Sequence, residues 1–503
     1  MQEKNSEKYY TTIGLEIHAE LKTTTKMFCS CRNNPDETKP NTNICPVCMA
    51  HPGALPVINK KAVENVIRVG LAIGAEIADF SEFDRKNYFY PDIPKGYQIS
   101  QYKYPIVKGG KLAGMDITRI HLEEDTANNK HLSGVGHPEI QDEYSLIDFN
   151  RAGVPLMELV TEAHTFETSE EAAKVASNFA KEYQLLLQYI DASEANMEKG
   201  EMRVEANVSV SPDKDKKWTA YVEVKNLNSF KSVEKAIKYE VERMIELFEE
   251  GKESEIVKET RGFDEAKQRT VSQRKKESSE DYRYFPDPDL PKMKLHEAFD
   301  LEKVKQELPE LPMQKRVRYK NDFGIKDEDI EIYINDKELA KWFEEVANLL
   351  FSPPARGGVS EGRGGGSEKI KTASNYITSD YLGIKKFQPE ARPLAATNFA
   401  ELINLVTENK ISSRATKDIL AMIVIDDASP LKIATEKNLL QKNDEGELKG
   451  IVEKILAENQ QVVATYKGGK ENALMSLVGK IIKETNGSAN PQVVIKLLKE
   501  LIK

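Results

Sequence analysis

The segment from Gly14 to Leu21, GLEIHAEL, alternates strictly between apolar and polar side chains. A period of two is typical of a β-strand with one face packed against a core. The polar face of this strand would carry Glu16, His18 and Glu20. Like charges stacked on a sheet repel one another and destabilise it. We therefore expect a hard divalent cation such as Mg²⁺ to offset these acids.

A second strand-like run, ITRIHLEEDT from Ile117 to Thr126, holds one histidine and three carboxylates within five consecutive residues. Such a density of acids is unfavourable unless a cation lies beside it. A flat strand places His121, Glu123 and Asp125 on one side. Glu124 then points to the other side, unless a bulge re-aims it.

Two further runs continue the alternating pattern. Met202–Ser211 would place Arg203 and Glu205 on its polar side, and Trp218–Leu227 would add Lys225. Polar faces of this kind describe either a solvated sheet or a concave site for a polyanion with a metal. Histidine and repeated glutamate on two separate strands favour the site, because the arginine and lysine side chains are available for phosphates.

Amphipathic helices are interleaved with these strands. Their spacing predicts one helix after Thr168 and another after Ser232, the second ending at Gly251. Strands with helical crossings and hairpins predict an α+β domain whose sheet has one polar working face.

The character of the chain changes twice along its length. Residues 1–295 hold the predicted strands, and residues 296–397 are rich in charge with helical spacing. Within the second region, the Pro/Gly/Ser-rich stretch 352–367 predicts a flexible loop. Residues 398–503 form an all-helical tail by pattern. We therefore predict three domains with boundaries near 295 and 397.

All four cysteines fall within twenty residues, as a CxC pair followed by a CPVC pair. Two close pairs separated by a loop suit tetrahedral Zn²⁺, because each pair can present both thiolates from one tight turn. Two disulfides are the alternative, which is unusual in a cytosolic chain. Four thiolates close the coordination shell, so we interpret the zinc as structural. The ligands of this knuckle at residues 29–48 would be Cys29, Cys31, Cys45 and Cys48.

The chain of 503 residues has a net charge of −10, which argues against indiscriminate nucleic-acid binding. From Gln461 to Lys503, however, there are seven lysines against three glutamates. In this tail, Lys467 and Lys470 flank two glycines that would allow close approach to an RNA backbone. No apolar run approaches the roughly 20 residues of a membrane span, and the N-terminus lacks the apolar core of a signal peptide. We expect a cytoplasmic protein that does not enter a membrane.

The chain contains, in this order, the segments GLEIHAEL, DRKNYFYPDIPKGYQISQ, HLEEDTA, SLIDFNRAGVPLMELV, VEVKNLNSF, DYRYFPDPDLP and GKENALMSLVGKIIKETNGSANP. Together they resemble the B subunit of the tRNA-dependent Asp/Glu amidotransferase over nearly the whole chain. The archaeal E-subunit relative shares the first part but carries an inserted domain, for which this length leaves little room. The Gly-rich stretch 357–366 is not part of the family pattern.

The resemblance implies an antiparallel-sheet cradle domain similar to glutamine synthetase and guanido kinases. It implies a ligase that uses ATP and Mg²⁺ to phosphorylate the side-chain carboxylate of mischarged Glu-tRNA(Gln) or Asp-tRNA(Asn). Ammonia then displaces the phosphate. It would come from glutamine through an amidase (A) subunit, and a small C subunit would complete a heterotrimer. The tail domain would bind the tRNA.

The resemblance also implies roles for individual residues. Lys86 and Lys95 match positions associated with the ammonia path or the entrance of the site. Lys225 and Asn226 match positions near the phosphate or the aminoacyl group. With these two we group the polar-face residues Arg203 and Glu205. The positions that match the family around the metal are Glu16, His18, Glu124 and Glu158, with Glu123 a further candidate.

Two other classes of protein stay open. A carboxylate–amine ligase acting on a small free substrate would share the metal site but would not need the helical arm and the basic tail. A non-catalytic zinc-bearing RNA-binding protein would keep the tail but has no use for stacked carboxylates. Within the amidotransferase interpretation, the sequence leaves open whether Glu-tRNA, Asp-tRNA or both are used.

Overall fold

The computed structural model describes residues 8–132, 144–216, 220–275, 281–351, 364–387, 393–441, 445–485 and 489–502. The chain divides into two compact units, Met1–Pro312 and Met313–Lys503. The division into three domains stays a prediction. Among the described residues, no helix is long and apolar enough to cross a membrane.

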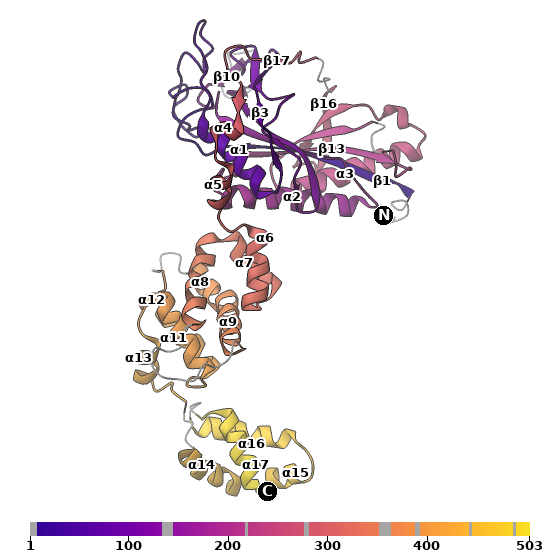
Figure 1. Ribbon diagram of the computed structural model, residues 1–503. Helices are drawn as coiled ribbons and strands as arrows, with labels where there is room; N and C mark the ends of the chain where they lie inside the picture. Colours follow the sequence, from indigo (N-terminus) through magenta and orange to yellow (C-terminus); the bar gives the residue numbers. More distant parts are fainter. Residues whose placement is uncertain are drawn as a thin grey trace, which may run out of the picture. The chain divides into compact units, whose positions relative to one another are not determined.

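One large sheet organises the first unit (Figure 1). Its described part has eleven strands, of which β12 (His164–Phe166) pairs with β1 and β7 (Lys111–Leu112) pairs with β8. The other strands lie across the sheet in the order β16 (Arg269–Lys275), β15 (Glu259–Asp264), β14 (Val222–Leu227), β13 (Met202–Ser211), β1 (Tyr10–Glu20), β11 (Pro155–Thr161), β8 (Met115–Glu124), β6 (Val107–Lys108) and β2 (Glu76–Ile77).

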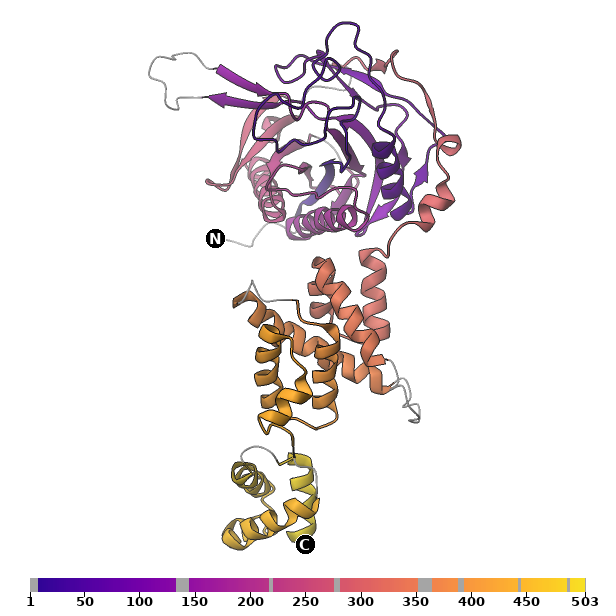
Figure 2. The same ribbon diagram turned by 90° about the vertical axis from the view of Figure 1, so that its left-hand side faces the viewer.

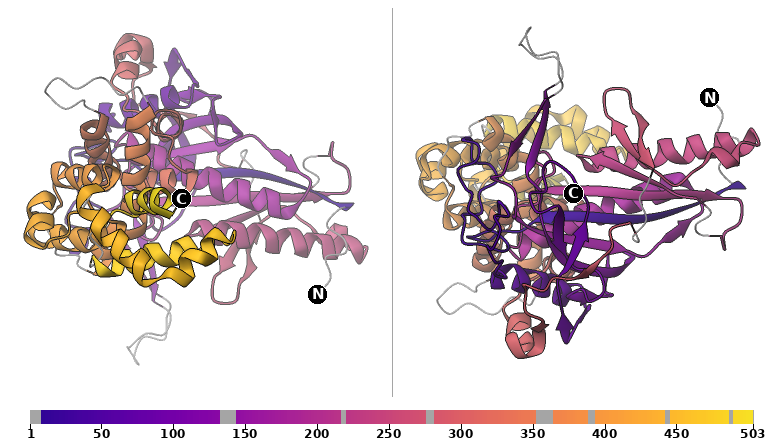
Figure 3. Two further views of the ribbon diagram at one scale, coloured as in Figure 1. Left: turned by 90° about the horizontal axis from the view of Figure 1, so that it is seen from below. Right: turned by 90° about the horizontal axis from the view of Figure 1, so that it is seen from above.

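Two long helices, α2 and α3, lie side by side along the apolar face of this sheet (Figures 2 and 3). Ile17 and Val204 of the sheet and Phe179 of α2 belong to the same buried core. The opposite face of the sheet is left for polar side chains. The helices of the first unit are α1 (Lys60–Ala72), α2 (Ser169–Tyr189), α3 (Phe230–Glu249), η2 (Glu253–Glu255), α4 (Leu295–Ala298) and α5 (Leu301–Gln306).

The sheet is mixed, so the prediction of an antiparallel sheet is wrong at one pair of strands. β14 and β15 run parallel, with Val222 beside Glu259, whereas the other described pairs of this sheet are antiparallel. The reason is the connection, because α3 lies between these two strands in the chain. A helical crossover returns the chain to the same end of a sheet, so the next strand runs in the same direction.

The helix starts follow from capping side chains. Thr168 caps α2 as predicted, and its hydroxyl accepts a hydrogen bond from the Glu171 N–H. Helix α3 begins three residues earlier than the sequence predicts. Ser229, not Ser232, has the extended backbone of a cap, and its hydroxyl accepts from the Ser232 N–H at 3.1 Å.

Small sheets complete the described part of the first unit. The three-stranded one is joined to the end of β8, because the Ile99 N–H donates to the Glu124 carboxylate and the Ser100 hydroxyl donates to the Glu123 carboxylate. The small sheets are β17 (Phe285–Pro286) with β4 (Asp84–Asn87) and β5 (Tyr97–Ser100), β9 (Asn128–Leu132) with β10 (Tyr144–Asp148), and β18 (Met293–Lys294) with β3 (Phe80–Ser81).

The second unit has only helical secondary structure in its described residues, apart from an isolated bridge between Ile411 and Leu440. Its last four helices, α14 to α17, enclose a buried core of their own, which includes Leu477 and Leu498. The helices are α6 (Pro312–Arg318), η3 (Tyr319–Phe323), α7 (Asp327–Asn335), α8 (Lys337–Phe351), α9 (Gly364–Tyr376), η4 (Ile377–Tyr381), α10 (Leu382–Phe387), α11 (Ala396–Thr407), α12 (Ser413–Asp426), α13 (Pro430–Glu436), α14 (Glu445–Glu458), α15 (Gln460–Lys467), α16 (Asn472–Glu484) and α17 (Pro491–Ile502).

The loop predicted at 352–367 lies outside the described residues up to 363. Its last part is not a loop, because α9 begins at Gly364. A close contact explains the glycine there: a Cβ on Gly366 would lie 2.8 Å from the ring of Phe351. Glycine at this position lets α9 approach the end of α8, so here it serves packing rather than flexibility.

Candidate active site

The polar face of the large sheet carries residues that lie opposite one another on four neighbouring strands. His121 on β8 lies opposite Glu158 on β11. Glu158 lies opposite His18 on β1, which in turn lies opposite Arg203 on β13. This row exists because the period of two turns these side chains to one face, while neighbours such as Ile17 enter the core.

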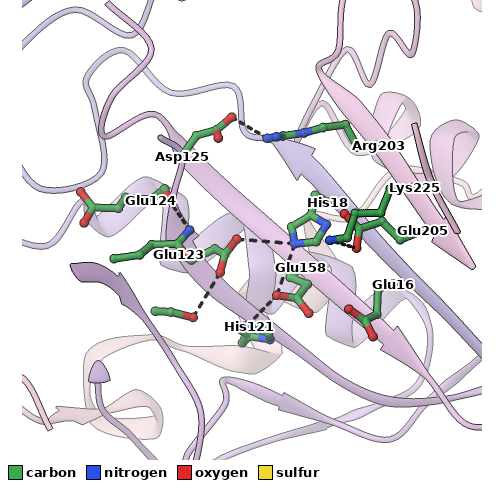
Figure 4. A network of polar contacts seen from close by, with 12 residues as sticks. Glu16, His18, His121, Glu123, Glu124, Asp125, Glu158, Arg203, Glu205 and Lys225 are labelled. Atoms are coloured by element: carbon green, nitrogen blue, oxygen red, sulfur yellow. Dashed lines mark hydrogen bonds and ion pairs between the residues drawn. The ribbon is translucent and has the colours of Figure 1, made fainter. Parts of the chain in front are cut away.

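His18, Glu123 and Glu158 bring three potential ligand atoms within 4.8 Å of one another. The His18 Nε2 lies 3.4 Å from a Glu158 carboxylate oxygen and 3.5 Å from Glu123 Oε1 (Figure 4). The His121 Nε2 lies 3.2 Å from the same Glu158 oxygen. Carboxylate and imidazole groups gathered in this way have the donor chemistry of a divalent cation site. We call these four residues the histidine–glutamate cluster.

The charges of the cluster depend on one another. Burial lowers the pKa of His18, but Glu158 and Glu123 outweigh burial and raise this pKa to about 9. Burial also disfavours the charge of Glu158, yet His121 and His18 hold its pKa well below the usual range. At neutral pH a protonated His18 therefore balances an ionised Glu158. A divalent cation bound here would take the place of that proton.

A second group of acids lies on the same face. Glu16, Glu205 and Glu223 place one oxygen each within 4.8 Å of one another. Lys225 partly neutralises them, with its Nζ 2.8 Å from Glu205 and 3.6 Å from Glu223. Burial lowers the pKa of Lys225, but Glu205 and Glu223 raise it above the ordinary range. The hydroxyl of Thr260 donates to Glu223 at 2.7 Å.

Arg203 is already engaged by a carboxylate. Its guanidinium lies 2.6 Å from Asp125 Oδ2, and Arg151 lies 3.7 Å from the same oxygen. Burial raises the pKa of Asp125, but Arg203 and Arg151 together lower it to about 2. The Arg203 charge is therefore compensated within the protein.

Glu123 and Glu124 point to opposite sides of β8. The Glu124 Oε1 lies 2.6 Å from the Lys95 Nζ and accepts the Ile99 N–H at 2.9 Å. Figure 4 shows Glu124 pointing away from His18. The irregularity in the pairing of β8 with β11 lies at Thr161, far from these residues. β8 thus keeps its alternation through this point, and Glu123 is the one that joins the cluster.

A cavity of about 550 Å³ opens above the polar face. Lys86 lies in its wall, with its Nζ 5.0 Å from the ring centre of Tyr282 and 5.8 Å from that of Tyr88. Burial disfavours the charge of Lys86, but Glu123 and other acids hold its pKa well above the usual value. The predicted site residues that line this cavity are Glu16, His18, Lys86, Glu123, Glu158, Arg203, Glu205 and Lys225.

The remaining predicted residues of the first unit lie elsewhere. Lys95 and Glu124 line a second cavity of about 380 Å³, together with Cys29 and Cys48. Asn226 lies at a bulge where β13 pairs with β14, has a φ of +64°, and exposes its side chain. The bulge turns Asn226 away from the cavity that Lys225 lines.

The four cysteines lie together, with one sulfur of each within 4.8 Å of the others, so they could hold a metal ion. Lys26 lies beside them without solvent exposure. Its ammonium group donates to the carbonyl oxygens of Asn43 at 2.8 Å and Phe149 at 3.1 Å. The hydrogen bond from Cys29, with Lys26 also contributing, lowers the pKa of Cys48 to about 5. The surroundings thus favour negative charge on the Cys48 sulfur, whereas neighbouring thiols and burial raise the pKa of Cys29 and Cys31.

The two predicted tRNA contacts lie on the surface of the second unit. Lys467 is the last residue of α15, and Lys470 follows a glycine turn in which Gly469 has a φ of +93°. Both lysines are exposed. The geometry leaves both ammonium groups accessible from solvent.

The predicted site omits several residues that the structure brings to the cavity. His121 and Arg119 share the side of β8 that carries Glu123, and Glu223 shares the side of β14 that carries Lys225. The period of two already places His121 on the side of Glu123, and the same rule places Arg119 and Glu223 on the polar face. Tyr282 gives no such signal, because its segment reaches the cavity only through the pairing of β17 with β4.

Comparison with known proteins covers almost the whole chain. The family model described as the GatB/GatE catalytic domain matches residues 11–300, and the one described as the GatB domain matches residues 364–502. Three similar proteins are named as the B subunit of an aspartyl/glutamyl-tRNA(Asn/Gln) amidotransferase. The protein from Gloeothece citriformis is 39% identical over 97% of both chains. The protein from Thermotoga maritima is 40% identical over 98% of this chain and 99% of its own. The protein from Caldanaerobacter subterraneus is 41% identical, with the same coverage of both chains.

Proposed function

The chain belongs to the family of aspartyl/glutamyl-tRNA amidotransferase B subunits, and from this premise we propose that its cavity activates a tRNA-borne carboxylate with ATP. The substrate would be mischarged Glu-tRNA(Gln), Asp-tRNA(Asn) or both. The observation that supports the proposal best is the histidine–glutamate cluster at the wall of one polar cavity. Two carboxylates and two imidazoles gathered in one cavity have the donor chemistry of a cation site, which an ordinary solvated sheet does not require.

The proposed chemistry has two steps. A side-chain carboxylate oxygen attacks the γ-phosphorus of ATP, which forms an acyl phosphate and releases ADP. Ammonia then attacks the acyl carbon, and phosphate leaves with formation of the amide. Phosphoryl transfer depends on positioning and charge neutralisation more than on covalent help from the protein. The residues of the cavity would therefore act by holding charge in place.

The carboxylate oxygens of the site suit Mg²⁺, which would supply positive charge to the β- and γ-phosphates. We propose Glu123, Glu158 and His18 as its ligands, with Glu16 contributing from the neighbouring acidic group. Lys225 orients that group through Glu205 and Glu223. The family pattern also suggests Glu124 as a ligand. Because Glu124 is paired with Lys95, we propose Glu123 as the ligand in its place.

The partners are also part of the proposal. The names of the relatives designate one chain of a larger enzyme, and we propose the amidase (A) subunit and the small C subunit as the other chains, in the cytoplasm. Lys86 and Lys95 would lie along the path of ammonia. The antiparallel part of the sheet, with α2 and α3 behind it, is consistent with a cradle related to glutamine synthetase and guanido kinases.

We propose a structural Zn²⁺ for the four cysteines. Four thiolates around Zn²⁺ carry a net charge of −2, and a buried ammonium requires such negative charge nearby. Lys26 meets this condition, because it is fully buried beside Cys48 and bonded to carbonyl oxygens of the surrounding loops. The buried cation thus supports a metal-loaded site over free thiols.

The assembled enzyme with glutamine, ATP and Mg²⁺ should convert mischarged Glu-tRNA, Asp-tRNA or both to the amide. Omission of ATP or Mg²⁺ should abolish conversion and the release of ADP. Charging assays on both tRNAs, with ADP measured in parallel, test this expectation. Conversion that continues without ATP would contradict the proposed function.

The tail should contribute to tRNA affinity through charge. Replacement of both Lys467 and Lys470 with Ala should weaken tRNA binding and reduce the slope of log affinity against log salt by about 1–2, because each phosphate contact contributes about one counterion. Lys449 offers a matched control, since it is an exposed lysine on α14 of the same tail. Filter binding at several salt concentrations tests this. An unchanged slope for the double variant would show that these lysines do not contact the RNA.

A further inference from the structure

Arg119 lies on β8, two residues before His121 and on the same side of the strand. Its side chain lines the cavity above the polar face, and its Nε is buried without a hydrogen-bond partner among the described residues. Opposite it on β11 lies Val160, and opposite Val160 on β1 lies Glu16. An apolar side chain thus separates Arg119 from the nearest acid in its row. The protein holds a guanidinium in an acidic cavity, and the described residues do not pair it.

The other cations of the cavity are engaged. Arg203 is bonded to Asp125, and Lys225 to Glu205. Lys86 lies against tyrosine rings, and Lys258 lies 4.8 Å from the ring centre of Tyr221. Arg119 is therefore the cavity arginine whose charge the described residues leave uncompensated. A guanidinium binds phosphate oxygens through two parallel N–H groups, which makes it suited to a phosphoryl group.

We infer that Arg119 binds the γ-phosphoryl group of ATP. This inference rests on the proposed function, because it needs ATP in the cavity. Alternate residues on a strand are about 7 Å apart, so Arg119 is one such step from His121. A phosphoryl group with a metal–oxygen bond of about 2.1 Å on one side and a hydrogen bond of about 2.8 Å on the other fits that span. Arg119 and a cation in the histidine–glutamate cluster would thus hold it from two sides.

The experiment compares nucleotides with and without the γ-phosphate. The dissociation constants of AMP-PNP and ADP are measured with Mg²⁺ on the assembled enzyme, for the wild type, Arg119→Gln and Arg119→Lys. Arg119→Gln should raise the dissociation constant of AMP-PNP about tenfold to a hundredfold more than that of ADP. Arg119→Lys should fall between the wild type and Arg119→Gln, because it keeps the charge and loses the two-pronged geometry.

Arg68 provides a matched control. Its Nε is also buried without a described partner, but it lies on α1 and does not line the cavity. Arg68→Gln should leave the ratio of the AMP-PNP and ADP affinities unchanged. Thermal melting identifies any variant that fails to fold. If Arg119→Gln does not fold, Arg119→Lys is compared with the wild type in its place.

The outcomes separate this inference from the proposed function. A wild type that binds neither nucleotide would overturn the proposed function itself. A wild type that prefers AMP-PNP, with Arg119→Gln keeping the same preference, would overturn only the role of Arg119. An equal loss of affinity for AMP-PNP and ADP would also overturn the role of Arg119. In that case the γ-phosphate would not be the group that Arg119 binds.

Discussion

Replacing Glu123 with Gln is expected to lower ATP-dependent ADP release and tRNA amidation by about 10²–10³-fold, the usual cost of one lost electrostatic contact in a catalytic site. The physical reason is the loss of one carboxylate from the histidine–glutamate cluster, where Glu123 lies 3.5 Å from His18. The amide keeps the shape of the side chain and its contact with Ser100, but Lys86 and His18 lose a charge partner, so the melting temperature should fall modestly. Affinity for the mischarged tRNA should remain, which filter binding checks beside the activity assay.

Glu124→Gln is the matched control, because it makes the same chemical change at the adjacent residue. Here we expect the opposite pattern. ADP release should stay within a few-fold of the wild type, since Glu124 points away from the cluster. The free energy of unfolding should fall, by less than the roughly 3–5 kcal/mol of a fully buried pair, because the partly exposed Lys95 loses its partner.

The two variants decide between the two glutamates. Thermal melting and ADP release are measured for both at a temperature below the melting of either. If Glu124→Gln loses ADP release and Glu123→Gln keeps it, the cation is bound on the other side of β8, and the proposed site is wrong.

Replacing Cys48 with Ser is expected to abolish retention of zinc and to open the segment around it. Metal binding stabilises small cysteine sites by roughly 10–16 kcal/mol in isolated peptides, so loss of one ligand should exceed most single substitutions. The amides of Met27, Val57 and Asn59 are bonded to backbone carbonyls beside the knuckle, and their protection against hydrogen exchange should fall. Elemental analysis and hydrogen-exchange mass spectrometry provide the measurements.

Lys26→Met tests, in the same experiment, whether the buried Lys26 ammonium stabilises the negatively charged zinc site. Methionine fills a similar volume without the ammonium, so we expect zinc to be lost to a chelator about tenfold more readily, as for other outer-shell partners. Ser30→Ala is the control, because this exposed residue lies between Cys29 and Cys31. A purified wild type without zinc and with full stability would refute the structural metal.

The sequence alone predicted much of the site because its pattern is local. The alternation in GLEIHAEL and ITRIHLEEDT determines which side chains share a face, since a strand turns each residue to the side opposite its neighbour. That rule placed Glu16 with His18, and Glu123 with His121. The spacing of the cysteines likewise predicted a cluster, which the structure forms. The seven family segments predicted the amidotransferase family, which the comparisons confirm.

Only the tertiary structure decided which faces meet. The alternation within one strand does not determine its register against the next strand. The row from His121 through Glu158 and His18 to Arg203 therefore follows from strand pairing alone. The crossover through α3 made one pair parallel, and a bulge turned Asn226 outward. Pairing also decided which charges are already compensated, such as Arg203 by Asp125, and which the described residues leave open, such as Arg119. Charge compensation depends on distances between residues far apart in the chain, and these distances exist only once the sheet has formed.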